Sequence, residues 1–335
     1  MSSANVAANP ASLDGTAVHE VHDWNHGARL LACRVDPTGK HVFTASTDRT
    51  VQRWDVVSGA KTVLTGHDNW VSDLACSLDG KTLYSVSYDG RLIFWDALAE
   101  APAPQRTIDA HRGWVRAVAL SSDGKWIATG GNDKVVKIWS TEDGSLVREM
   151  AGHAHFIFSL LFRPGSTDLV SGDLLGKIHH WDAAQGTLVR QFDASEIHFE
   201  IGDWSHYGGI LGLAFSPDGK TLIANGLHKV SNALANGQQG VALAYDWEQG
   251  SLVRKHESIK EERGAIVWGA LFHPSGQLIA GLAEYLAFWK PDEADLYHVL
   301  ETKSPIYALD LHPNQVDLFT AHFDGHLRVM KLARG

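Results

Sequence analysis

The feature that most constrains this chain is a Trp-Asp dipeptide, or a close variant of it, that recurs along nearly the whole sequence. The seven pairs are Trp54-Asp55, Trp95-Asp96, Trp139-Ser140, Trp181-Asp182, Tyr245-Asp246, Trp289-Lys290 and Met330-Lys331. Five of the six intervals between them match a structural unit of about 40–45 residues, which is the length of four short strands and their turns. The interval from Trp181 to Tyr245 is clearly longer.

Turn residues recur in register with these pairs. A glycine follows the Trp position at a constant spacing at Gly59, Gly144, Gly186 and Gly250, and a second turn with glycine lies in mid-repeat at residues 37–39, 78–80, 122–124, 217–219 and 274–276. The runs between the turns, such as Leu83–Ser87 and Val135–Trp139, are short and rich in β-branched and aromatic residues, as strands require. The pattern predicts an all-β chain.

Three further positions keep the same register. A histidine precedes the mid-repeat glycine at a constant spacing, as His67 precedes Gly80 and His206 precedes Gly219, a hydroxyl residue follows that glycine, and an aspartate precedes the Trp position. The histidines are His26, His67, His111, His153 and His206; the hydroxyl residues include Thr44, Ser85, Thr129 and Ser171; the aspartates are Asp48, Asp89, Asp133 and Asp324. With Gly66-His67 and Gly152-His153, this set resembles the WD-repeat family from about Thr16 onward.

The resemblance implies a seven-bladed β-propeller of four-stranded antiparallel blades, in which the four residues of a repeat form a hydrogen-bonded tetrad. The implied tetrads are His26, Thr44, Asp48 and Trp54; His67, Ser85, Asp89 and Trp95; and His111, Thr129, Asp133 and Trp139. Later repeats depart from the pattern, with Leu175 in place of Asp, Ala224 and Gly281 in place of the hydroxyl residue, and Met330 without a histidine. We expect those blades to be held more by apolar packing.

The last repeat contains only three strand-like segments before the sequence ends at residue 335. The resemblance implies that an N-terminal strand near Ala17–Val21 supplies the fourth by pairing with His326–Leu332, because a propeller leaves two open edges unless its ends are joined. We therefore expect a flexible tail over residues 1–15, a single propeller over residues 16–335, and no harm from deleting residues 1–14.

Composition narrows the function classes. The net charge is −10, which disfavours general binding to nucleic acid phosphates. The two cysteines, Cys33 and Cys76, lie in apolar strand patterns and suggest packed thiols in a reducing compartment. No secretory signal or apolar stretch of membrane-spanning length is evident. The sequence predicts a cytoplasmic protein that binds neither nucleic acid nor membranes.

The 19 histidines raise the question of a metal or catalytic site. The sequence contains no metalloprotease, nucleophile-elbow or phosphate-loop motif, and five histidines already fill the repeat position. Asp48, Asp89 and Asp133 belong to different blades, so we do not read them as one cluster. We expect no catalytic residues, no cofactor and no metal. The alternative is a propeller enzyme or small-ligand binder that uses the mouth of the central channel.

The long fifth interval contains two insertions of equal length, one between Gly186 and His206 and one between Ala224 and Tyr245. Both emerge on the same face of a propeller, and long loops are often functional. We predict a non-catalytic scaffold that binds protein partners through its faces and these loops. The candidate contacts are His198, Phe199, Trp204, Tyr207, His228, Lys229 and Gln238. The alternative is that the two inserts only pack on each other.

Overall fold

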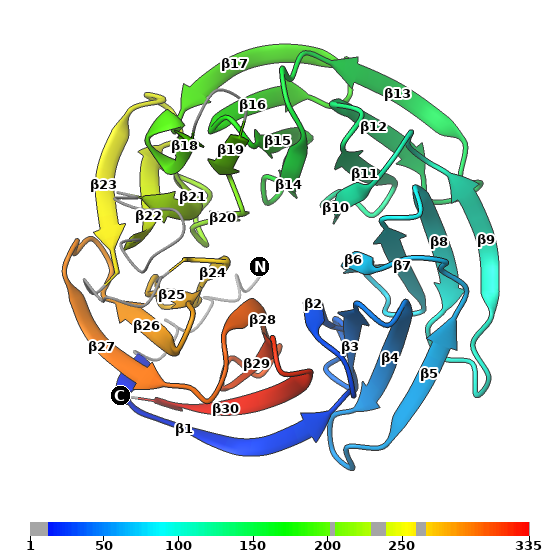
Figure 1. Cartoon of the computed structure of the whole chain (residues 1–335), viewed down its shortest axis with the longest axis horizontal. Coiled ribbons are helices and arrows are strands. Elements are labelled where there is room, and N and C mark those ends of the chain that lie inside the picture. Colours follow the sequence, from blue (N-terminus) through cyan, green and yellow to red (C-terminus); the bar gives the residue numbers. More distant parts are fainter. Residues whose placement is uncertain (1–12, 202–204, 229–238, 259–265, 335) are drawn as a thin grey trace, which may run out of the picture.

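The computed structural model describes residues 13–201, 205–228, 239–258 and 266–334. Seven four-stranded antiparallel sheets are arranged as blades in a ring around a central axis (Figure 1). The predicted seven-bladed propeller is thus confirmed. An eighth, two-stranded sheet lies between blades 4 and 5.

In blades 1 to 6 the strands run in chain order from the inner to the outer edge, and in blade 7 the outer strand is the N-terminal β1. Blade 1 comprises β2 (Leu30–Val35), β3 (His41–Ser46), β4 (Thr50–Asp55) and β5 (Lys61–Thr65); blade 2 comprises β6 (Val71–Cys76), β7 (Thr82–Ser87), β8 (Arg91–Asp96) and β9 (Pro104–Asp109); blade 3 comprises β10 (Val115–Leu120), β11 (Trp126–Gly131), β12 (Val135–Ser140) and β13 (Leu146–Ala151). Blade 4 comprises β14 (Ile157–Phe162), β15 (Asp168–Asp173), β16 (Lys177–Asp182) and β17 (Thr187–Asp193).

The first insert follows as η1 (Ser195–Ile197) and the hairpin of β18 (His198–Ile201) and β19 (Ser205–Gly208). Blade 5 comprises β20 (Gly212–Phe215), β21 (Thr221–His228), β22 (Gln239–Asp246) and β23 (Leu252–Glu257); blade 6 comprises β24 (Gly269–Phe272), β25 (Leu278–Gly281), β26 (Tyr285–Trp289) and β27 (Leu296–Glu301); blade 7 comprises β28 (Ile306–Leu311), β29 (Asp317–His322), β30 (His326–Arg334) and β1 (Leu13–Asn25).

The apolar core lies between adjacent blades rather than inside any one of them. One cluster joins Phe43 and Val51 of blade 1 to Leu74, Ile93 and Trp95 of blade 2, all of them at most 1% exposed. Because a strand presents alternate residues to opposite faces, each blade can bury one face against the preceding blade and the other against the next. Every blade thus depends on having neighbours on both sides.

The N-terminal strand closes the ring. β1 pairs antiparallel with β30, with His19 opposite Lys331 and Asn25 opposite His326, and it lies along the outer edge of the last blade (Figure 1). The predicted pairing is confirmed. The strand begins before Thr16, however, since Leu13 is opposite Arg334 and the Gln277 side chain donates a hydrogen bond of 2.7 Å to the Leu13 carbonyl. A harmless deletion must therefore end at residue 12, which is the part of the expected tail that lies outside the described residues.

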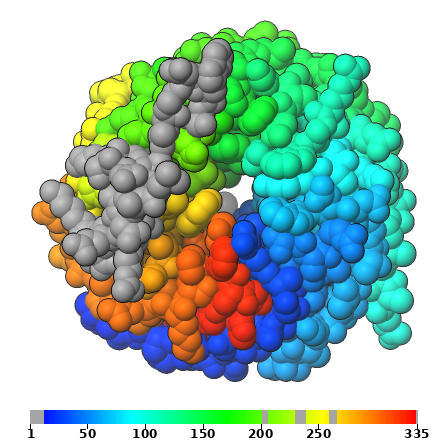
Figure 2. Space-filling model, viewed as in Figure 1, coloured from blue at the N-terminus to red at the C-terminus, as the bar shows by residue number. Residues whose placement is uncertain are grey.

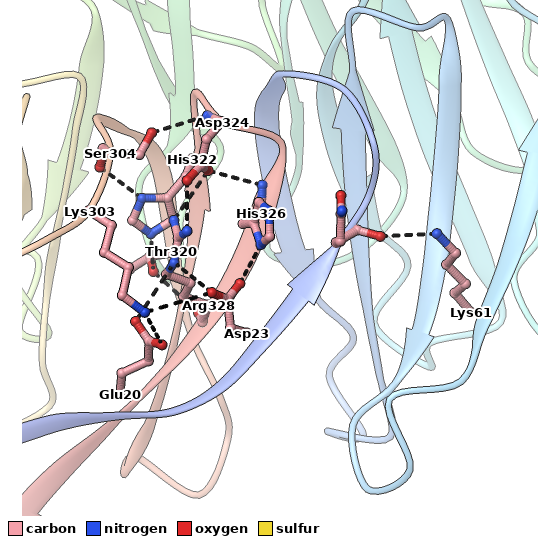
Figure 3. A network of polar contacts seen from close by, with 11 residues as sticks. Glu20, Asp23, Lys61, Lys303, Ser304, Thr320, His322, Asp324, His326 and Arg328 are labelled. Carbon is pink, nitrogen blue, oxygen red and sulfur yellow. Dashed lines mark hydrogen bonds and ion pairs between the residues drawn. The ribbon is translucent and has the colours of Figure 1, made fainter.

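A polar network reinforces this closure (Figure 3). Asp23 of β1 accepts hydrogen bonds from His326 at 2.5 Å and from Arg328 at 3.3 Å, while Glu20 pairs with Lys303 at 3.0 Å. The Arg328 side chain also reaches Asp324 at 2.7 Å and is only 2% exposed as a residue. A buried guanidinium needs such partners, and two of its carboxylate neighbours come from the N-terminal strand.

The three proposed tetrads are brought together in blades 1, 2 and 3. In blade 2, His67 lies 2.9 Å from Asp89 and 2.8 Å from the Ser85 hydroxyl, which also accepts a 2.8 Å hydrogen bond from the Trp95 indole. Blade 3 repeats this with His111, Asp133, Thr129 and Trp139 at 2.7–3.0 Å. In blade 1, His26 lies 2.8 Å from Thr44 and 3.3 Å from Asp48, and Trp54 donates to Thr44 at 3.0 Å.

The later blades correct the sequence-based assignment. Blade 4 does form a tetrad, because Asp173, two residues before Leu175, lies 2.9 Å from His153, and Ser171 contacts both His153 and Trp181 at 2.6 and 2.8 Å. Blade 7 also has a histidine: His322 lies 2.9 Å from the Thr320 hydroxyl.

Blade 5 departs furthest from the predicted pattern. His206 is not at a tetrad position, since it belongs to β19 of the hairpin. Tyr245, in the Trp position, instead donates a 2.8 Å hydrogen bond to the Asp193 carbonyl of blade 4.

Substitutions should separate tetrad histidines from His206. We expect His67→Ala to lower the free energy of unfolding by about 1–3 kcal/mol, because it leaves buried partners unpaired, and Trp95→Ala to lower it by about 3–5 kcal/mol, as for other buried large aromatics. His206→Ala should have little effect. Chemical denaturation measures these differences, and equal midpoints for the His67 and His206 variants would contradict the assignment.

Three buried histidines predict a loss of stability in mild acid. Desolvation lowers the pKa of His179, His256 and His322 to about 4, below the model-peptide value of about 6.5. The unfolded chain therefore binds more protons between these values, so their contribution is full above about pH 6.5 and is lost as the pH falls toward 4.

We expect each of these histidines to remove about 1–3 kcal/mol over that range. Urea unfolding at pH 7 and pH 5 measures the loss, and His256→Gln should show a smaller loss than the parent chain. An equal loss of unfolding free energy in the parent and the variant would contradict its assignment to protonation of His256.

Candidate functional site

Two kinds of loop emerge on one face of the ring. One is the loop that leads from the outer strand of the preceding blade into the inner strand of a blade. The other is the turn between the second and third strands of that blade. The two loops lie side by side because antiparallel strands alternate in direction. Backbone hydrogen bonds join the two loops, as from Tyr88 to Trp70 at 3.0 Å and from Phe323 to Pro305 at 2.9 Å. This face, which we call the loop face, also carries the β18–β19 hairpin.

Aromatic side chains are exposed on the loop face of blades 2 and 3. Trp70 and Trp114 are 40% and 42% exposed, and Tyr88 lies between them, stacked on Trp114 with 4.3 Å between ring centroids and 2° between planes. The Arg116 guanidinium lies 5.1 Å from the Trp114 ring and donates a 2.7 Å hydrogen bond to Asn132. Burial lowers the pKa of Arg116.

A second aromatic group lies on blades 6 and 7. Trp268 stacks on Tyr307 with ring centroids 4.5 Å apart, and Tyr307 stacks on Phe323 at 5.9 Å. Phe323 is 41% exposed, and Arg29 of the loop before blade 1 lies 3.9 Å above its ring. Burial raises the pKa of Tyr307. We call the six aromatic residues of the two groups the aromatic belt.

The second group borders the central channel, which is visible as an opening in the space-filling view (Figure 2). The channel encloses about 630 Å³ and is lined by the inner strands of all seven blades, with Arg116, Trp268 and Tyr307 among the lining residues. Deeper charged groups are already engaged: Arg34 lies 3.9 Å from Asp73 and 3.7 Å from Asp310. Asp73 and Asp310 also accept hydrogen bonds from the backbone of the next blade, so they tie inner strands together.

The predicted insert residues have different positions. His198, Phe199 and Tyr207 lie on the β18–β19 hairpin, where Phe199 and Tyr207 are cross-strand partners and Tyr207 is 44% exposed. Trp204, Lys229 and Gln238 lie outside the described residues. His228 is only 8% exposed at the end of β21, with Glu196 at 3.4 Å and Glu257 at 3.8 Å. This corrects the expectation of a surface contact at His228, because the side chain is buried between two carboxylates.

The start of the first insert is anchored on blade 5. Ile197 of η1 is fully buried in a core cluster with Val241 and Leu243 of β22, and Glu196 pairs with Lys255 of β23 at 2.6 Å. The base of the first insert therefore packs on the blade that carries the second. The hairpin extends from this base.

The sequence analysis missed the aromatic belt, although a signal was present. Trp70 and Trp114 each follow a tetrad histidine by three residues, and Phe156 holds the same position after His153. In the structure this position is where the chain turns from the loop face into an inner strand. An aromatic residue recurs at this position in blades 2, 3 and 4, so the register of the repeat indicates the blade 2 and blade 3 part of the belt once the loop is placed.

The two cysteines are unpaired thiols, with Cys33 buried and Cys76 partly buried, and burial raises the pKa of both. The helical content of the described ranges is the three-residue η1, and nothing in those ranges forms a helix that could span a bilayer.

Comparison with known proteins agrees with this architecture. The family model described as "WD domain, G-beta repeat" matches residues 15–55, 60–96, 102–140 and 144–182. Nuclear distribution protein nudF of Emericella nidulans is 28% identical over 181 residues, which cover 48% of this chain and 40% of that protein. Apoptotic protease-activating factor 1 of Rattus norvegicus is 30% identical over 188 residues, which cover 56% of this chain and 15% of that protein.

The chain thus matches less than half the length of these relatives. Four repeats recognised in sequence are continued by three more blades in the structure, with tetrads in blades 1 to 4 and a ring closed by its own N-terminal strand. The chain belongs to the WD-repeat family of β-propellers.

Proposed function

We propose that this protein is a non-catalytic interaction adaptor that binds a protein partner on its loop face. The observation that carries the proposal is the aromatic belt with Arg29 and Arg116, two groups of partly exposed, stacked side chains on the loop face. Trp, Tyr and Arg are enriched at the centres of protein interfaces. Stacking holds these rings in place before binding, which lowers the ordering cost on association.

The blade-5 inserts extend the proposed surface. Phe199, Trp204 and Tyr207 would add aromatic contacts, and His198, Lys229 and Gln238 would contribute a polar rim. The base of the first insert on blade 5 supports this arrangement, because a fixed base limits the freedom of the hairpin. We keep the cytoplasmic location and the absence of nucleic acid binding as predictions.

The small-ligand alternative has weaker support. The charged groups deep in the channel, Arg34, Asp73 and Asp310, already pair with each other and with backbone amides. The relatives named above are a nuclear distribution protein and an apoptotic factor, two different cellular roles that share the repeat. We infer that the propeller supplies a binding platform whose partner is set by its surface residues.

Alanine substitution on the belt tests the proposal. A partner is captured with the tagged full chain, identified by mass spectrometry and titrated against purified variants. We expect Trp70→Ala and Trp114→Ala to weaken its binding by at least about 2 kcal/mol, or about 30-fold. Melting temperatures should change little, because both side chains are partly exposed.

Val57→Ala is the matched control, since Val57 is 91% exposed in the β4–β5 turn on the opposite face. Full-strength binding by both belt variants would refute the aromatic belt as the binding surface. Equal weakening by Val57→Ala would also refute it, because the effect would then not depend on the face that is changed.

Trp204→Ala tests the insert part separately. If Trp204 is an interface anchor, binding weakens by about 2 kcal/mol or more with the melting temperature little changed. A fall in melting temperature, with binding lost only through unfolding, would assign it a packing role instead and restrict the interface to the belt.

A further inference from the structure

The β18–β19 hairpin brings together three metal-ligating side chains. Glu200 is directly opposite His206, and His198 precedes Glu200 by two residues on the same strand, so all three share one face of the hairpin. His198 Nε2 lies 3.0 Å from His206 Nδ1, and that nitrogen lies 3.7 Å from Glu200 Oε1. One ligand atom from each residue lies within 4.8 Å of the others.

The donor set suits a divalent transition ion. Zinc is commonly held by imidazole nitrogens at about 2.0–2.1 Å, and a tetrahedral ion then places two nitrogens about 3.3 Å apart. The observed 3.0 Å separation is close to that value. Two histidines and one carboxylate form a known zinc ligand set, whereas Mg²⁺ and Ca²⁺ prefer oxygen ligands.

The hairpin itself has reason to need a cross-link. The other seven sheets have four strands, but this one has two strands of four residues each, and an isolated two-stranded hairpin is marginally stable in water. Its opposite face carries Phe199 and Tyr207, which are cross-strand partners. A metal bound by both strands would fix the hairpin and the orientation of these two aromatic residues.

We propose that His198, Glu200 and His206 form a Zn²⁺ site with water in the fourth position, and that the ion stabilises the hairpin on the loop face. His155 of blade 4 borders the site, with its ring centroid 5.2 Å from that of His206. Its Nδ1 accepts a 2.9 Å hydrogen bond from the Phe156 amide, so that nitrogen is occupied by the protein itself. The proposal is independent of partner binding, because it concerns the free chain.

Titration of Zn²⁺ into the EDTA-treated, dialysed full chain tests the site. Isothermal calorimetry should show one ion bound per chain. His198→Asn and His206→Asn should each weaken binding by more than about 100-fold, since even changes to residues behind the ligands cost about 10–100-fold. Glu200→Gln, at an exposed position, should weaken it without affecting the fold.

His19→Asn is the matched control, because His19 is exposed on β1, far from the hairpin in sequence, and it should bind Zn²⁺ as the parent does. Hydrogen exchange gives a second readout: Zn²⁺ should protect amides 198–201 and 205–208 in the parent and the His19 variant only. No stoichiometric binding by the parent, or equal binding by the His206 and His19 variants, would overturn the proposal. In that case the contact between His198 and His206 is a hydrogen bond between two imidazoles.

Discussion

The pairing of β1 with β30 is the interaction on which the rest of this structure depends. Each blade buries its faces against two neighbours, so the first and last blades of an open array would each expose an apolar sheet. Pairing of the N-terminal strand with the C-terminal blade closes the ring, so that the first and last blades pack against each other. The pairing extends from Leu13 to Asn25, and the buried Arg328 links it to the polar network of the last blade.

A closed ring fixes where loops can vary. Inner strands are tied to each other by backbone hydrogen bonds to Asp73 and Asp310, and tetrads hold blades 1 to 4. The frame therefore tolerates additions on the loop face, where the β18–β19 hairpin and the aromatic belt are found. Rigid placement of Trp114 on Tyr88 and of Phe323 under Arg29 follows from this frame, because their backbones belong to the strands and turns that it fixes.

The repeat could be predicted from the spacing of its residues, and the resemblance to the WD-repeat family implied the number of blades and the closing strand. Spacing gave the wrong tetrad assignment where a residue at a shifted position makes the expected hydrogen bond. In blade 4, Asp173 contacts the histidine from a position two residues before the expected one. In blade 7, His322 hydrogen-bonds to the Thr320 hydroxyl from within the same strand. His206 has the expected spacing to Gly219 yet lies in an inserted hairpin, since an insertion can restore a spacing by chance. The aromatic belt depends on contacts between blades, which no single repeat contains.

Truncation of the N-terminus tests the closed ring most directly. Guanidinium unfolding is measured for chains lacking residues 1–12 and residues 1–25. The account predicts that the shorter deletion unfolds like the full chain, that the longer one unfolds at a clearly lower midpoint, and that an added peptide of residues 13–25 raises that midpoint again. Equal midpoints for the two truncated chains would contradict the claim that β1 holds the propeller together.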